Sequence, residues 1–232
     1  MKRICTICAR GGSKGVLNKN LKLIKGLPLI AYSIERALES KMFEVVSVSS
    51  DSADILEAAR KYGASILIER PAELATDTAA KLPVIQHCFL ESEKIAQTTF
   101  DVIVDLDCTS PLRSVDDIRG SLEMYESTPG ASNLITGAKA RRSPYFNLVQ
   151  KNSKGFVELA GKSDRPIIRR QDAPECYDMN ASIYIWTRAS LLQAQKAIQE
   201  TTILFEMPEE RSLDVDSPLD FEIVQFLLER RP

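Results

Sequence analysis

Near its amino terminus the chain reads Arg3-Ile4-Cys5-Thr6-Ile7-Cys8-Ala9-Arg10-Gly11-Gly12-Ser13-Lys14-Gly15. The first six of these residues are mostly apolar and predict a buried strand, and a glycine-rich loop follows at once. Glycines let a backbone come close to a ligand, and successive N–H groups in such a turn form a concavity that binds anions. Arg10, Lys14 and Lys19 add positive charge. The segment therefore predicts a polyphosphate-binding loop at the carboxyl end of a strand.

This loop differs from two better-known phosphate-binding loops. A P-loop has Gly-x-x-x-x-Gly-Lys followed by Ser or Thr, and a dinucleotide-binding loop has Gly-x-Gly-x-x-Gly. The run Gly11-Gly12-Ser13-Lys14-Gly15 matches neither pattern. Taken alone, the loop is equally well an ordinary surface turn with solvated lysines.

Strands and helices alternate through the first half of the chain. The expected strands are 3–8, 45–49, 66–68, 101–106 and 133–137, and the expected helices are 28–41, 53–62, 81–95 and 116–125. This alternation predicts a doubly wound, mostly parallel α/β sheet covered by helices. Ligands bind outside the carboxyl ends of such strands. We therefore expect the loops that start near residues 10, 50, 69, 107 and 137 to meet at one cleft.

The pattern changes between residues 140 and 179. This part holds short strand signals with glycine, proline and charge but no helical periodicity, which predicts a small β-rich arm. The main domain is expected to comprise 1–139 and 180–232. Its last part holds predicted strands at 181–186 and 202–207 and predicted helices at 188–199 and from Ser217 onward. Ser217, Pro218 and Asp220 form a capping-box pattern at the start of that final helix.

The segment Leu213-Asp214-Val215-Asp216 lies just before that final helix. In an extended segment, residues two apart project to the same side, so Asp214 and Asp216 are expected to lie side by side. A hard divalent cation relieves the repulsion of two such carboxylates, and Mg²⁺ commonly takes one or two carboxylates together with substrate phosphates. Two solvated carboxylates before a helix are the other reading of the pair taken alone.

The predicted strand 101–106 runs into Asp105-Leu106-Asp107-Cys108-Thr109-Ser110-Pro111. Asp107 falls at the expected cleft, whereas Asp105 is expected deeper in the sheet. His87 is the only histidine of the chain and falls in the middle of a predicted helix. A Ser-His-Asp hydrolase or a two-histidine zinc site is therefore hard to build. Cationic side chains, carboxylates and a metal instead favour phosphoryl or nucleotidyl transfer.

Composition narrows the function classes further. The 232 residues fit one large α/β domain with a small appendage. A formal net charge of −2 argues against a general nucleic-acid-binding protein, which usually has a basic excess. No apolar stretch predicts a signal peptide or a membrane span. The five cysteines are scattered and odd in number, which favours reduced thiols in a cytoplasm.

Taken together, these segments resemble the acylneuraminate cytidylyltransferase family, the CMP-sugar synthetases for nine-carbon α-keto acids. The resemblance is carried, in family order, by Ala9–Gly15 with Lys19-Asn20-Leu21, Arg70–Ala79, Thr109–Arg113, Arg170-Gln171, Asn180–Ile185 and Leu213–Asp216. It implies a three-layer, Rossmann-like nucleotidyltransferase fold and a reaction in which CTP and a 2-keto sugar acid give a CMP-sugar and pyrophosphate.

The resemblance also implies roles for individual residues. Arg10, Ser13, Lys14 and Lys19 would hold the triphosphate, with Arg10 and Lys14 stabilising the charge that builds up during transfer. The cytidine would contact Asn20, Arg70 and the loop at Thr78, and Asp214 and Asp216 would hold Mg²⁺. The sugar would contact Asp107, Thr109, Ser110, Arg170, Gln171 and Asn180. Members of the family are homodimers whose arm reaches the partner's active site, so Arg170 on the predicted arm would act in its own subunit or in the partner.

Two positions depart from the enzymes for sialic acid. Those enzymes typically carry glutamine where Asp107 stands, and they can carry an arginine near Asp178. The Asp-Leu-Asp-x-Thr-Ser-Pro-Leu-Arg and Arg-Arg-Ser-Pro-Tyr-Phe-Asn patterns resemble the branch that acts on di-N-acetylated analogues such as legionaminic acid. The alternatives are a sialic or pseudaminic acid substrate, the eight-carbon acid Kdo, a different nucleotide on the same scaffold, and a non-catalytic protein that binds sugar nucleotides.

Overall fold

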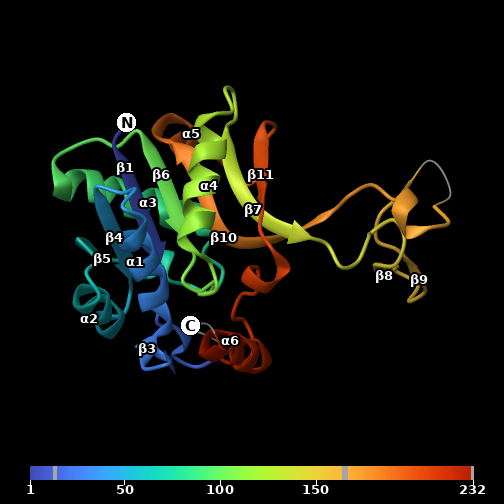
Figure 1. Cartoon of the computed structure of the whole chain (residues 1–232), viewed down its shortest axis with the longest axis horizontal. Helices are drawn as coiled ribbons and strands as arrows, with labels where there is room; N and C mark the ends of the chain where they lie inside the picture. Colours follow the sequence, from blue (N-terminus) through green and yellow to red (C-terminus); the bar gives the residue numbers. More distant parts are fainter. Residues whose placement is uncertain (13–14, 164–166, 231–232) are drawn as a thin grey trace.

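The computed structural model describes residues 1–12, 15–163 and 167–230, and it is built around a seven-stranded sheet (Figure 1). The strand order is β11-β7-β10-β6-β1-β4-β5. The strands are β1 (Arg3–Cys8), β4 (Val45–Ser50), β5 (Ile66–Glu69), β6 (Val102–Leu106), β7 (Asn133–Lys139), β10 (Tyr177–Thr187) and β11 (Thr202–Glu206). Among these described strands β10 alone runs antiparallel to its neighbours β6 and β7. The mostly parallel sheet is confirmed.

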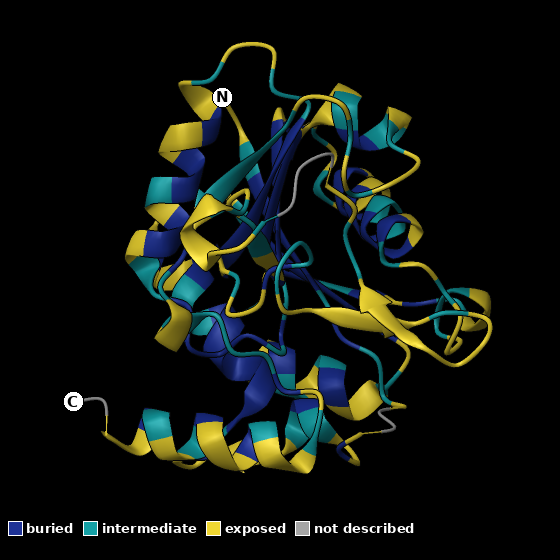
Figure 2. Cartoon of the chain, turned by 90° about the vertical axis from the view of Figure 1, so that its right-hand side faces the viewer, coloured by how far each residue is buried: buried dark blue, intermediate teal, exposed yellow. Residues whose placement is uncertain are grey.

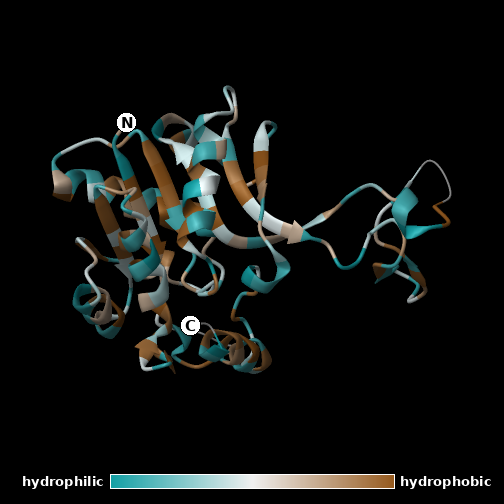
Figure 3. Cartoon of the chain, viewed as in Figure 1, coloured by the Kyte–Doolittle hydropathy of each residue, from teal (hydrophilic) through white to brown (hydrophobic). Residues whose placement is uncertain are grey.

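Helices cover both faces of the sheet and make three layers. On one face the core contains apolar residues of α1 (Leu29–Ser40), α2 (Ala53–Lys61) and α4 (Val115–Glu126). On the other face it contains residues of α3 (Lys81–Ala96) and α5 (Arg188–Gln193). Figure 2 shows the buried strands between helices whose outer surfaces are exposed, and Figure 3 shows the apolar character of the central strands. Burial of both sheet faces explains why β6 reads as an almost continuous apolar run.

A third cluster of apolar residues lies at the lower end of the sheet in Figure 1. It joins α6 (Pro218–Arg230) to the two-stranded ribbon of β2 (Leu23–Ile24) and β3 (Leu27–Pro28). The expected capping box begins α6, because Asp220 accepts a hydrogen bond from the Ser217 backbone N–H at 2.7 Å and donates its own N–H to Ser217 Oγ. This arrangement fixes the chain that leads into α6.

Short 3₁₀ turns complete the chain outside the sheet and the longer helices. They are η1 (Lys19–Leu21), η2 (Ala72–Leu74), η3 (Arg170–Asp172) and η4 (Glu209–Arg211). No helix in the described ranges has the length and apolar character that crossing a membrane requires.

The helix expected at 188–199 is wrong beyond its first half, because α5 ends at Gln193. Side chains from α3 and β7 bind the carbonyl groups that a longer helix would use internally. Gln86 donates to the carbonyls of Leu191 and Ala194, and Asn133 donates to that of Ala197. The chain therefore turns toward β11 after less than two helical turns.

The predicted arm leaves the sheet between β7 and β10 and projects well away from the body of the molecule (Figure 1). It carries the antiparallel pair β8 (Val149–Lys151) and β9 (Val157–Leu159). The strand expected at 181–186 is longer than predicted, because β10 begins at Tyr177 and pairs with the end of β7 at Lys139. Several large apolar side chains of the arm are exposed, namely Leu148, Val149, Phe156, Val157, Leu159 and Ile168.

Candidate active site

A cavity of about 360 Å³ lies at the carboxyl ends of the parallel strands. It is lined by Cys8, Arg10, Gly15, Lys19, Asn20, Arg70, Leu74, Thr76, Asp77, Ala79, Lys81, Val84, Asp107, Cys108, Thr109 and Asp216. Three of the five loops expected to meet there do so, namely those after β1, β5 and β6. The loop after β4 supports the site from behind, because Asp51 accepts a hydrogen bond from the Gly11 N–H at 2.9 Å. The chain after β7 leads into the arm instead.

The first loop is held by hydrogen bonds on both sides of the cavity. The Arg10 guanidinium lies 2.8 Å from an Asp77 carboxylate oxygen, and the Arg10 carbonyl accepts from the Asn20 side chain at 2.9 Å. Asn20 is buried, and its amide oxygen accepts from the Cys108 thiol. Arg10 and Asn20 thus lie together, as expected. The predicted phosphate-binding residues Ser13 and Lys14 lie outside the described residues.

The loop and the acidic couplet are in direct contact, although Lys19 and Asp216 are 197 positions apart. Lys19 Nζ lies 3.0 Å from an Asp216 carboxylate oxygen and also donates to the Val215 carbonyl. A Cβ atom added at Gly15 would lie 1.9 Å from the Asp216 carbonyl oxygen. Backbone packs on backbone here, so only glycine fits at position 15.

The first carboxylate of the couplet, Asp214, has a shifted pKa. Burial and the adjacent Asp216 carboxylate raise the pKa of Asp214 to about 6. Within the described residues, no group of three or more His, Cys, Asp or Glu side chains could hold a metal. A cation here would therefore take these two carboxylates and complete its shell with substrate phosphates and water. That oxygen-only set fits Mg²⁺.

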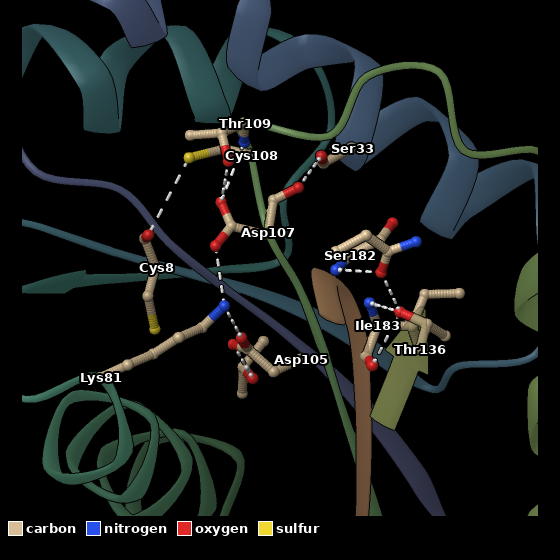
Figure 4. A network of polar contacts seen from close by, with 12 residues as sticks. Cys8, Ser33, Lys81, Asp105, Asp107, Cys108, Thr109, Thr136, Ser182 and Ile183 are labelled. Carbon is tan, nitrogen blue, oxygen red and sulfur yellow. Dashed lines mark hydrogen bonds and ion pairs between the residues drawn. The ribbon is translucent and has the colours of Figure 1, made fainter. Parts of the chain in front are cut away.

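A second acidic pair meets a lysine at the end of β6 (Figure 4). Lys81 Nζ lies 2.7 Å from Asp107 Oδ2 and 3.5 Å from Asp105 Oδ2. The other oxygen of Asp107 accepts from the Thr109 backbone N–H and hydroxyl, both at 2.9 Å, and that of Asp105 accepts from the Thr6 hydroxyl. Asp105 is fully buried, as expected, whereas Asp107 faces the cavity.

These contacts shift the pKa values of the two acids in opposite directions. Burial alone would raise the pKa of Asp107, but the Lys81 ammonium and the two Thr109 donors outweigh it and lower that pKa to about 2. For Asp105, burial outweighs Lys81 and raises the pKa. Burial also disfavours the Lys81 ammonium, yet Asp107 and Asp105 outweigh it and raise the pKa of Lys81. Asp107 and Lys81 therefore form an ionised pair at the cavity wall.

Lys81 is absent from the residues that the sequence analysis singled out. It stands at the first position of α3, and no acidic residue occurs in the first turn of that helix. The positive end of the helix dipole disfavours a lysine there. A lysine at the start of a predicted helix could therefore have indicated from the sequence that an anion lies nearby. In the structure the anions are Asp105 and Asp107.

Arg113 ends the Thr109–Arg113 segment, and no role was predicted for it from the sequence. It is buried, and its guanidinium donates to the Ser182 carbonyl and hydroxyl, the Ser33 hydroxyl and the Asp107 carbonyl. All these partners are neutral, so burial lowers the pKa of Arg113. The guanidinium joins α1, the β6 loop and β10, and it thereby fixes the backbone of Asp107.

Comparison with known proteins agrees with this geometry. A family model described as cytidylyltransferase matches residues 4–224. The chain belongs to the cytidylyltransferase family. Membership makes it a nucleotidyltransferase.

Two bacterial relatives match this cytidylyltransferase along nearly their whole length. A protein named post-translational flagellin modification protein B, from Campylobacter coli, is 47% identical and covers 98% of this chain and 95% of the relative. A protein named CMP-N,N'-diacetyllegionaminic acid synthase, from Campylobacter jejuni, is 48% identical, with 97% and 94% covered. A solved structure of CMP:2-keto-3-deoxy-manno-octonic acid synthetase with CTP is similar in fold, with a TM-score of 0.72, 19% identity and 99% of both chains covered.

The structure places the remaining predicted residues of this cytidylyltransferase at different distances from the cavity. Arg70 lines it and donates to the Ser49 carbonyl at 2.8 Å, and Thr78 lies between lining residues and is exposed. Ser110 is buried and does not line the cavity. Asn180 is also buried, and its amide bonds with Thr136, Ser182 and Ser212. Ser110, Asn180 and the predicted metal ligand Asp214 are therefore not among the residues that line the cavity.

Arg170 and Gln171 lie on the arm and line a separate hollow there together with Arg142 and Glu175. Within one subunit the structure does not bring them to the main cavity. Their predicted contact with the sugar therefore requires the arm to approach another subunit.

Proposed function

We propose that this chain transfers CMP from CTP to the anomeric hydroxyl of a nine-carbon 2-keto sugar acid and releases pyrophosphate, with N,N'-diacetyllegionaminic acid as the preferred acceptor. The observation that carries the proposal is the contact between the glycine-rich loop and Asp216, the second acid of the couplet, at one cavity. The Campylobacter jejuni relative named CMP-N,N'-diacetyllegionaminic acid synthase and the acidic Asp107 in place of glutamine support the choice of sugar.

In this proposal the triphosphate lies along the first loop, where Arg10 and Lys19 provide positive charge. Arg70 and Asn20 contact the cytidine, and Asp107 and Thr109 contact the sugar acid. The anomeric hydroxyl loses its proton to water and its oxygen forms a bond to the α-phosphorus. The bond between the α-phosphorus and the oxygen that bridges to the β-phosphate breaks, and pyrophosphate leaves. Asp214 and Asp216 would hold Mg²⁺, which neutralises phosphate charge when bound. The protein contributes mainly positioning and charge neutralisation, as is typical of such transfers.

The proposed reaction is tested by pyrophosphate release from CTP with a panel of acids. Diacetyllegionaminic acid is expected to give the highest kcat/KM, above sialic, pseudaminic and Kdo acids, and UTP or GTP should not replace CTP. A higher kcat/KM with another acid would overturn the sugar assignment. Binding of CMP-sugar without pyrophosphate release from any pair would support the non-catalytic alternative and overturn the enzymatic one.

We also propose that the enzyme is a cytoplasmic homodimer whose arm meets the second subunit. Two observations support this: the described cysteines are all free, and the arm exposes apolar side chains, with Phe156 70% and Ile168 82% exposed. Arg170 and Gln171 would then reach the partner's cavity.

The Phe156→Asp variant is expected to shift the mass measured by light scattering from dimer to monomer, because a carboxylate would be buried without a partner. Phe226→Asp is the matched control, since Phe226 is 51% exposed on α6, outside the arm, and should leave the dimer intact. The role of the arm would be contradicted if the wild-type protein were a monomer. It would also be contradicted if Phe226→Asp broke the dimer and Phe156→Asp did not.

A further inference from the structure

The Lys81 ammonium is shared between two carboxylates that stand two residues apart at the end of β6. Its side chain is 34% exposed and lines the cavity, and the ammonium also lies 4.4 Å from the centre of the Tyr184 ring. Figure 4 shows the amine between Asp105 and Asp107. Lys81 is therefore held by contacts from two strands of the sheet and has little freedom to turn away.

The charges of the described cavity lining are nearly balanced by ion pairs. The lining holds four cations, Arg10, Lys19, Arg70 and Lys81, and three carboxylates, Asp77, Asp107 and Asp216. Three of these cations are paired, Arg10 with Asp77, Lys19 with Asp216 and Lys81 with Asp107. Without Lys81 the lining would lose its excess of positive charge. The acid left unpaired, Asp107, would face the cavity with Asp105 buried behind it.

A nucleoside triphosphate must bring several negative charges into this cavity. A carboxylate without its counter-ion would repel these charges across the partly buried site, where interactions are screened less than in water. Asp107 cannot simply move out of the way, because Thr109 and the Arg113–Asp107 carbonyl bond fix its position. A cation must therefore be held next to the Asp107 carboxylate if the cavity is to accept a triphosphate.

We propose that Lys81 is a positioning residue for nucleotide binding, which neutralises Asp107 and holds it in place so that the cavity accepts the triphosphate. Lys81 acts through Asp107, and the two side chains behave as one unit. This inference rests on the proposed use of CTP but not on the identity of the sugar.

The test is a double-mutant cycle on CTP binding, measured by calorimetry without any sugar acid. Lys81→Met is expected to weaken binding on the order of tenfold, the effect of one unit charge about 10 Å away at an effective dielectric constant near 20. The double variant Lys81→Met/Asp107→Asn removes the carboxylate charge as well and should recover most of the lost affinity. A side chain that only packs would show no such recovery.

Two further variants separate charge from shape and from general effects. Lys81→Gln keeps a hydrogen-bond donor without the charge and should bind CTP as weakly as Lys81→Met. If thermal unfolding shows that Lys81→Met does not fold, Lys81→Gln replaces it in the cycle. Lys94→Met is the matched control, because Lys94 is on the same helix, pairs with Glu91 and is exposed. It should bind CTP like the wild type.

The outcomes distinguish this inference from the proposed function. Wild-type binding by both Lys81 variants, or a double variant no better than Lys81→Met, would overturn the role of Lys81 while the proposed function stands. Restored binding in Lys81→Gln would also overturn it, since charge would then be unimportant. A wild-type protein that does not bind CTP would overturn the proposed function itself.

Discussion

Replacing Gly15 with alanine is expected to lower kcat/KM for CTP by about a hundredfold or more while the protein remains folded. A Cβ atom there would lie 1.9 Å from the Asp216 carbonyl oxygen and 3.1 Å from its carbon, so one of the two backbones must move. A displacement of about 1 Å in a positioning element can cost about a hundredfold in rate. Because the contact lies at the surface of the cavity and not in the core, the sheet should persist. Steady-state kinetics with thermal unfolding measures both effects.

Gly12→Ala is the matched control for this variant. Gly12 belongs to the same loop, but a Cβ atom added there meets nothing within 4 Å. Its kcat/KM should fall less than that of Gly15→Ala, because no protein atom has to move to accept the new methyl group. Equal losses in the two variants would indicate that the loop needs glycine for flexibility, and the contact with Asp216 would then not be the reason.

The second large effect is expected from Asp216→Asn. Removing one of two carboxylates should raise the Mg²⁺ concentration for half-maximal activity by at least about tenfold. Mutating a residue that only hydrogen-bonds to a metal ligand typically weakens metal binding by about that much. Asp214→Asn should shift the same midpoint. The measurement is a Mg²⁺ titration of pyrophosphate release at saturating CTP.

Two variants show whether the metal is the reason. Lys19→Met also breaks the ion pair with Asp216, but it removes no carboxylate and should not raise the Mg²⁺ midpoint. Glu210→Gln changes an exposed acid shortly before the couplet and should behave like the wild type. An unchanged midpoint in Asp216→Asn, or an equal rise in Lys19→Met, would contradict the metal role of the couplet.

The sheet was predictable from the sequence because its strands are buried on both faces and therefore read as apolar runs. The clearest examples are β1, β4 and β6, and the helices between them showed their own periodicity. The end of α5 was not predictable, since it depends on Gln86 and Asn133, which reach it from distant elements. The same is true of the irregular pairing of β10, where Ala181 has a φ of 52°.

The candidate site was partly predictable, for a related reason. Arg10, Asp107 and the Asp214–Asp216 couplet follow recognisable local patterns at the ends of strands or before a helix. Lys81 stands in no recognised motif, and Arg113 ends a motif that gives it no role; the roles of both come from their partners. The internal position of Asn180 likewise depends on Thr136 and Ser212, which the sequence does not link to it.

The claim on which the account depends is that residues 15–21 and 213–217 form one nucleotide site. Hydrogen exchange with and without CTP and Mg²⁺ tests it most directly, because protection reports which backbone segments a ligand holds. We predict protection of both segments and of residues 107–109, with no change in the body of α2, residues 53–61. Protection of only one of the two segments, or of neither, would contradict the account.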